Sequence, residues 1–148
     1  MGVRLRLDSI SASLADSFRK ADDEQRRHAA LATCLVAVAQ ADLQGNEIDA
    51  AVDFLRHGGE DQLAVRRKLD SLTEQFDEKY FELSEDADGT TPEALVVFRK
   101  ARAAAALAFA LSPDPGQLHE AMYEAIVASD DEAEAVRAAD VALRSRRH

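Results

Sequence analysis

Apolar side chains recur every three or four positions along residues 7–43, and no Gly or Pro interrupts them. This spacing places them on one face of a helix. Two polar residues, Gln25 and His28, fall on the same face. We predict one long helix over residues 7–43. The alternative is two helices, the second of which begins with Asp22 or Asp23 as its N-terminal cap.

Shorter stretches with the same spacing follow, and Gly, Pro and Asn residues separate them. They predict helices over residues 46–57, 60–84, 92–111, 114–128 and 129–148. The chain has only 6 Gly and 3 Pro and is rich in Ala, Leu, Glu and Arg, which favour helices. We therefore predict an all-α, single-domain bundle of five to six helices over residues 1–148, with a long N-terminal helix and an Ala-rich central helix.

The Ala-rich helix is apolar on every side over residues 103–111. A helix of that kind is buried all round, because no face of it suits water. We place it either at the centre of the bundle or at a contact between two subunits. In the second case, a large charged residue in place of Ala104 or Ala108 would separate the subunits.

Charge limits the partners that this chain can bind. Lys and Arg number 18 against 28 Asp and Glu, a formal net charge of −10. The resulting field repels nucleic acid and anionic membranes and attracts basic proteins. Basic clusters do occur, as in residues 26–28, but no aromatic residues are interleaved with them to stack on bases. We therefore expect no nucleic acid partner.

The single cysteine, Cys34, lies in an apolar run and cannot form an intramolecular disulfide. This is typical of proteins from the reducing cytoplasm, which is where we expect this one. The apolar run 101–111 is too short to span a bilayer, so we expect no membrane insertion.

A row of carboxylates marks the third predicted helix, where Asp70, Glu74, Glu78 and Glu82 follow one another in steps of four. Such steps place them on one helix face, and repulsion at that spacing costs about 0.2–0.5 kcal/mol per pair. One interpretation is a solvated face relieved by nearby cations. The other is a surface that binds a basic protein. The complete candidate partner-binding set is Asp70, Glu74, Asp77, Glu78, Glu82 and Glu85.

The string Asp86-Ala87-Asp88-Gly89-Thr90 matches the D-x-D-G-T pattern of haloacid-dehalogenase-type phosphatases. That pattern follows a parallel strand, whereas here the end of an amphipathic helix precedes it. A calcium loop would need carboxylates where Ser84 and Leu95 stand. We therefore interpret the segment as a loop before a helix.

Metal and catalytic groups are sparse. His119, Glu120 and Glu124 on the fifth predicted helix are the best candidate metal ligands, and Glu120 and Glu124 lie one turn apart. No E-x-x-H pair of the di-iron type is present, and Cys34 resembles a buried apolar residue rather than a nucleophile. We assign no catalytic residue and no cofactor.

These features favour a non-enzymatic binding or regulatory protein, of the immunity, antitoxin, chaperone or adaptor type, that presents an acidic helical surface to a protein partner with a basic surface. One alternative is a helical-bundle protein or enzyme that binds a metal or ligand through carboxylates and His. The other is a structural homo-oligomer.

Overall fold

The computed structural model describes residues 4–85 and 91–144. Over these residues the chain forms seven α-helices, two short 3-10 helices and no strand. Its elements in chain order are η1 (Arg6–Ser9), α1 (Ala12–Lys20), α2 (Asp23–Ala41), α3 (Asn46–His57), α4 (Gln62–Glu85), α5 (Pro92–Ala110), η2 (Pro115–Gln117), α6 (Leu118–Ala128) and α7 (Glu132–Arg144).

The predicted long N-terminal helix is wrong, because α1 ends at Lys20 and α2 begins at Asp23. Asp22 caps α2: its carboxylate accepts from the backbone N–H of Gln25, and the Gln25 side chain accepts from the N–H of Asp22. Arg26 reaches back and donates to the carbonyls of Phe18 and Arg19 at 2.9 Å. The backbone groups at the end of α1 and at the start of α2 thereby have hydrogen-bond partners. The described helices number seven rather than the predicted five to six.

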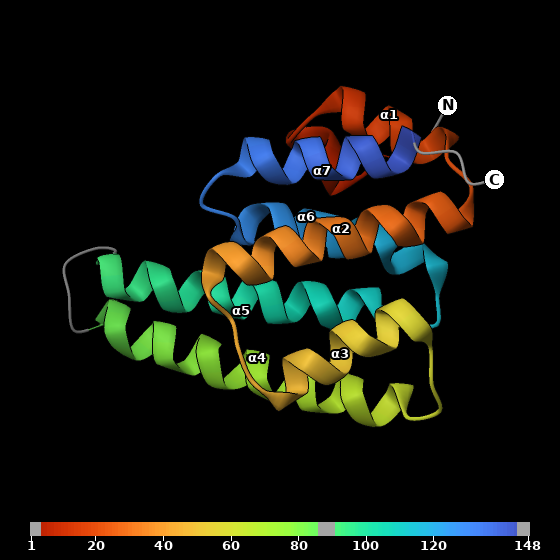
Figure 1. Cartoon of the computed structure of the whole chain (residues 1–148). Coiled ribbons are helices and arrows are strands. Elements are labelled where there is room, and N and C mark those ends of the chain that lie inside the picture. The colour runs from red at the N-terminus through yellow and green to blue at the C-terminus, as the bar shows by residue number, and fades with distance from the viewer. Residues whose placement is uncertain (1–3, 86–90, 145–148) are drawn as a thin grey trace.

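Helix α5 lies in the middle of the fold, between α2 and α6 on one side and α4 on the other (Figure 1). Its residues Ala103, Ala104 and Ala106 are fully buried, because their small side chains let the neighbouring helices approach closely. Helices of the same chain therefore cover most of the Ala-rich segment, which fits the central position predicted for it.

The remaining helices form layers around α5 (Figure 1). Helix α7 packs on α2, and η1 and α1 lie over α6 and α7. On the other side α4 runs along α5, with α3 against the first half of α4. Buried side chains from all seven helices belong to one hydrophobic cluster, so the core is continuous through the layers.

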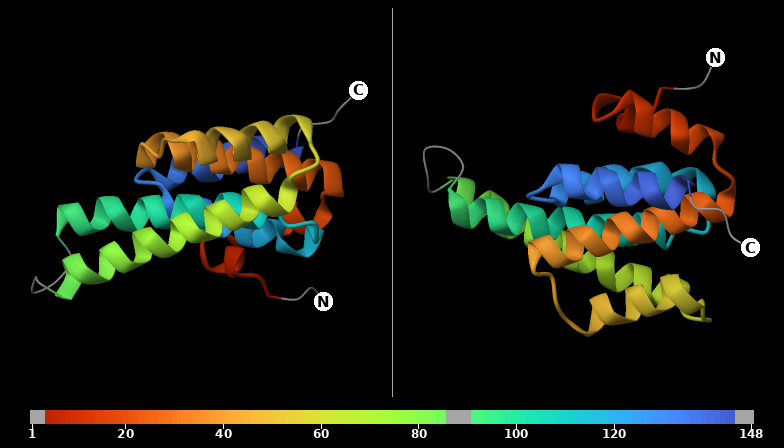
Figure 2. Two further views of the ribbon diagram at one scale, coloured as in Figure 1. Left: turned by 90° about the horizontal axis from the view of Figure 1, so that it is seen from below. Right: turned by 45° about the horizontal axis from the view of Figure 1, so that its top comes forward.

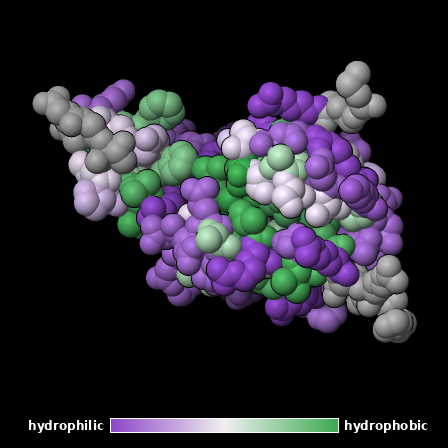
Figure 3. All heavy atoms as spheres, turned by 90° about the horizontal axis from the view of Figure 1, so that it is seen from above, coloured by the Kyte–Doolittle hydropathy of each residue, from purple (hydrophilic) through white to green (hydrophobic). Residues whose placement is uncertain are grey.

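The end of α4 and the beginning of α5 project beyond the other helices in every view (Figures 1 and 2). Viewed from above, the molecule shows apolar side chains in the hollow between this projecting end and the other helices (Figure 3). Helix α4 itself buries only one residue, Leu69. Many of its other side chains are exposed.

No helix within the described ranges has both the length and the apolar character that crossing a membrane requires.

Candidate protein-binding face of helix α4

Helix α4 has one face directed at the core. Leu69 is fully buried there, and Val65, Leu72 and Phe76 are half-buried against the core cluster. Further along, the ring of Tyr80 lies 5.4 Å from that of Phe98 on α5, centroid to centroid. These contacts fix the rotation of α4 about its axis and so decide which side chains face outward.

The outward face of α4 carries a line of exposed carboxylates. No ion pair or hydrogen bond to any of them occurs among the described residues. Within residues 4–85 and 91–144, no cation therefore lies close enough to form an ion pair with these carboxylates. We call these five residues the acidic row: Asp70, Glu74, Glu78, Glu82 and Glu85.

Asp77 differs from the rest of the predicted set, because it lies at the edge of the row and is paired. Nη2 of Arg102 lies 3.0 and 3.2 Å from its two carboxylate oxygens. This ion pair joins α4 to α5. This contact therefore links the two projecting helices, and Asp77 is the only member of the set with an ion pair among the described residues.

Two exposed apolar side chains share the outward face with the acidic row. Phe81 is 66% exposed and Leu63 is 58% exposed. Since each residue turns an α-helix by about 100°, positions 63 and 81 project in nearly the same direction as positions 70, 74 and 78. Phe81 thus stands among carboxylates, and Leu63 lies about five turns away along the same line.

Sequence reasoning missed these two side chains, although the signal was present. The core-facing stripe of α4 passes through Tyr80 and Leu83, so Phe81 is a large aromatic residue beside the stripe rather than on it. An aromatic residue in such a position is exposed once the stripe is buried. We call the acidic row together with Leu63 and Phe81 the docking face.

The predicted metal ligands lie elsewhere, in an ion-pair network between η1, α5 and α6. Glu124 is 5% exposed, and its two oxygens lie 3.1 Å from Nη2 of Arg6 and 3.1 Å from Nη1 of Arg102. Arg6 also pairs with Glu120, and this contact raises the pKa of its guanidinium. Arginines therefore already occupy oxygens of both carboxylates.

His119 is the third of these candidates. Its Nδ1 lies 3.3 Å from Oε1 of Glu120, and its ring meets that of Phe18 edge-on at 6.1 Å. Within the described part of the chain no three His, Cys, Asp or Glu residues are placed to hold a metal ion. His119 packs α6 against α1.

The remaining candidates for chemistry lie apart from the docking face. Asp86–Thr90, the D-x-D-G-T string, is outside the described residues. Cys34 is completely buried in α2, and this burial raises the pKa of its thiol to about 12. The thiol stays protonated at neutral pH and is not an available nucleophile.

The chain matches no known protein-family model, no curated protein and no solved structure. Its function therefore has to be inferred from the geometry of its own residues.

Proposed function

We propose that this chain is a non-enzymatic binding or regulatory protein whose docking face, on α4, receives a basic and partly apolar surface of a protein partner. The observation that supports the proposal most directly is that the acidic row is exposed and has no ion pair or hydrogen bond within the described residues, and that the exposed ring of Phe81 lies beside it. The single Cys34 leads us to place the interaction in the cytoplasm.

The docking face is unfavourable for the isolated chain in two ways. Carboxylates one turn apart repel each other, and Phe81 and Leu63 expose apolar surface to water. A partner with Lys or Arg opposite the row and an apolar pocket opposite Phe81 would relieve both. Large aromatic side chains in such pockets supply much of the binding free energy of an interface.

The same charges affect the rate of association. A net charge of −10 together with a local line of carboxylates steers a basic partner toward α4. The effect weakens as salt is added, because the Debye length shortens. Self-association through this face is disfavoured, since a symmetric contact would place one acidic row against another.

A charge reversal tests the proposal. We expect the triple variant Glu74→Lys, Glu78→Lys, Glu82→Lys to lose the partner while it keeps its helical far-UV circular dichroism, because all three side chains are exposed. Partner occupancy is measured by native mass spectrometry of tagged protein purified from its own host. The rate constant for association with the partner should be at least roughly tenfold lower for the variant than for the wild type.

A matched control separates local charge from net charge. The variant Asp49→Lys, Asp53→Lys, Glu132→Lys changes the net charge equally at exposed positions outside the docking face, and it should keep the partner. A photo-reactive benzophenone side chain at position 81, but not at position 53, should crosslink to the same protein. Full occupancy in the Glu74/Glu78/Glu82 variant would refute the proposal.

A further inference from the structure

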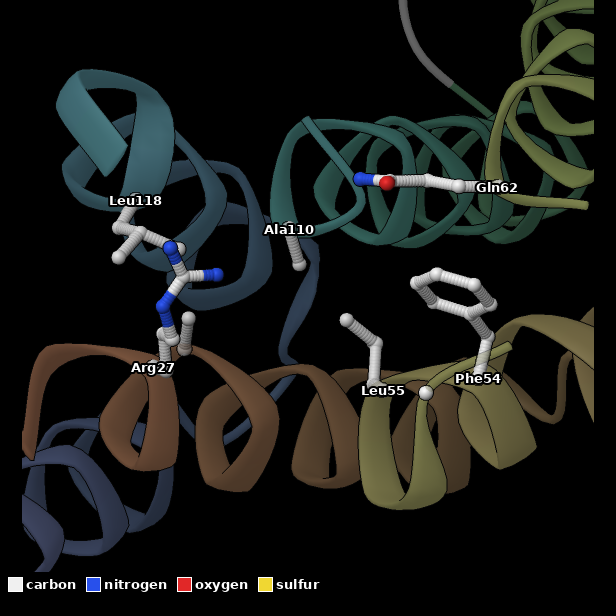
Figure 4. Close-up of a pocket in the computed structure, with 8 residues that line it drawn as sticks. Arg27, Phe54, Leu55, Gln62, Ala110 and Leu118 are labelled. Carbon is white, nitrogen blue, oxygen red and sulfur yellow. The ribbon is translucent and has the colours of Figure 1, made fainter. Parts of the chain in front are cut away.

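A pocket of about 220 Å³ lies where α2, α3, α5 and α6 approach the first residue of α4. None of its lining residues belongs to the docking face. Phe54 and Leu55 project into it from α3, Gln62 lies at one end beside Phe54, and Arg27 lies at the other end beside Leu118 (Figure 4). The complete lining is Arg27, Ala30, Phe54, Leu55, Gly58, Gln62, Ala110 and Leu118.

Five of the eight residues that line the pocket have apolar side chains. Ala30, Ala110 and Leu118 are buried, and Phe54 and Leu55 are half-buried. A cavity of roughly 150 Å³ with walls of this kind is large enough to bind benzene. The pocket therefore has space for one six-membered ring and a short substituent. Larger molecules would have to extend outside it.

One polar group of the pocket is already engaged. The side-chain amide of Gln62 donates to the carbonyl of Leu111, at the C-terminal cap of α5. That carbonyl would otherwise be left without a partner at the helix end. This hydrogen bond holds Gln62 in place as part of the wall and joins the beginning of α4 to the end of α5.

The other polar group is unpaired. Arg27 has no ion pair or hydrogen bond with any described residue, whereas its neighbour Arg26 caps α1 and Arg102 is paired twice. The planar guanidinium of an arginine offers parallel N–H donors that fit both oxygens of a carboxylate. The pocket therefore combines an apolar body with one free anion-binding group at its end.

We propose that this pocket binds a small organic monocarboxylate, with its ring or branched apolar body against Phe54, Leu55 and Ala110 and its carboxylate on Arg27. Arg27 is the one cationic side chain in the lining, and a single cation favours a ligand with one negative charge over a phosphate dianion. The pocket shares no residue with the docking face. An experiment can therefore refute either of the two proposals without affecting the other.

Phenylacetate is the probe, because it joins one ring to one carboxylate. Added at millimolar concentration to the isotope-labelled full chain, it should shift the amide resonances of residues that line the pocket, including Ala30, Leu55 and Ala110. The neutral analogue phenylacetamide should bind roughly tenfold more weakly, since it lacks the charge that Arg27 recognises.

Two variants assign the effect to the guanidinium. Arg27→Gln should weaken phenylacetate binding by roughly tenfold, with unchanged far-UV circular dichroism because Arg27 is exposed on its helix. Arg67→Gln removes the same charge from an exposed position on α4 and should leave binding unchanged. Absence of shifts with phenylacetate, or equal affinity in Arg27→Gln, would overturn the proposal.

Discussion

At the scale of single residues, Glu124 is the one charged side chain that is buried among the described residues. Its buried carboxylate lies between the guanidinium groups of Arg6 and Arg102, and Arg102 also binds Asp77 on α4. A buried carboxylate is expensive to desolvate unless its oxygens are hydrogen-bonded. Here two arginines from different elements satisfy it, so one side chain links η1, α5 and α6.

We predict that Glu124→Gln lowers the free energy of unfolding by about 2 kcal/mol. The amide removes the negative charge and leaves Arg6 and Arg102 facing each other. Urea denaturation followed by circular dichroism measures the change. Glu78→Gln, which alters an exposed and unpaired carboxylate, should change the free energy by less than about 0.5 kcal/mol. Equal stability of the two variants would contradict this account of Glu124.

At the scale of elements, the junction between α1 and α2 decides how the N-terminal quarter of the chain packs. The reciprocal hydrogen bonds of Asp22 and Gln25 cap the N-terminus of α2. The side chain of Arg26 donates hydrogen bonds to two backbone carbonyls at the end of α1. Phe18, near the end of α1, is buried, and Cζ of Arg26 lies 4.7 Å from the centre of its ring. The chain can therefore turn here without leaving backbone groups unsatisfied.

We predict that Asp22→Ala destabilises the protein by about 1 kcal/mol, the usual cost of removing an N-terminal cap. In a continuous helix the same substitution would be stabilising, because Ala is the better helix former. Chemical denaturation measures the change in the free energy of unfolding. A decrease indicates two helices with a cap at Asp22, and an increase indicates one continuous helix. Asp23→Ala is the control, and it should cost less. Among the described residues, Asp23 accepts no capping hydrogen bond, and its only ion pair, with Arg26, spans 4.0 Å.

At the scale of the whole molecule, the hydrophobic cluster joins all seven described helices. Helices that share one core unfold together when no part of them is stable alone. Cys34 reports on this cooperativity, because it is fully buried and the pKa of its thiol is about 12. A reagent can reach it only after α2 has separated from its neighbours.

We predict that alkylation of Cys34 by iodoacetamide is negligible in the native protein and rises with urea at the same midpoint as the loss of circular dichroism. The variant Cys34→Ala, Ser71→Cys is the control, and it should react without urea because Ser71 is exposed. If Cys34 reacts well below the midpoint, α2 opens independently, and the expectation of one domain over the whole chain fails.

Gln25 shows how a sequence pattern can be misread. It appeared as a polar interruption of the apolar face in one predicted long helix. The spacing of Asp22 and Gln25 is also that of a capping box, and the structure uses it in that way. Both interpretations fit the spacing, because a cap and a helix interior differ only in how the backbone continues.

Local chemistry determined much of this protein before any packing was considered. Residue composition and a period of three to four residues predict helices, and the step of four in Asp70, Glu74, Glu78 and Glu82 predicts a shared face. These properties depend on neighbours within one or two turns. The sequence alone is therefore sufficient for them, and the all-α class is confirmed.

Only the tertiary structure decided which of these groups remain free. Asp77 and Glu124 bind Arg102 across three helices. In contrast, the acidic row and Arg27 have no ion pair or hydrogen bond among the described residues, and Phe81 stays largely exposed. The pocket likewise joins segments as distant as Arg27 and Leu118. Such pairings depend on how helices cross in space. The sequence alone does not show which residues far apart in the chain come into contact.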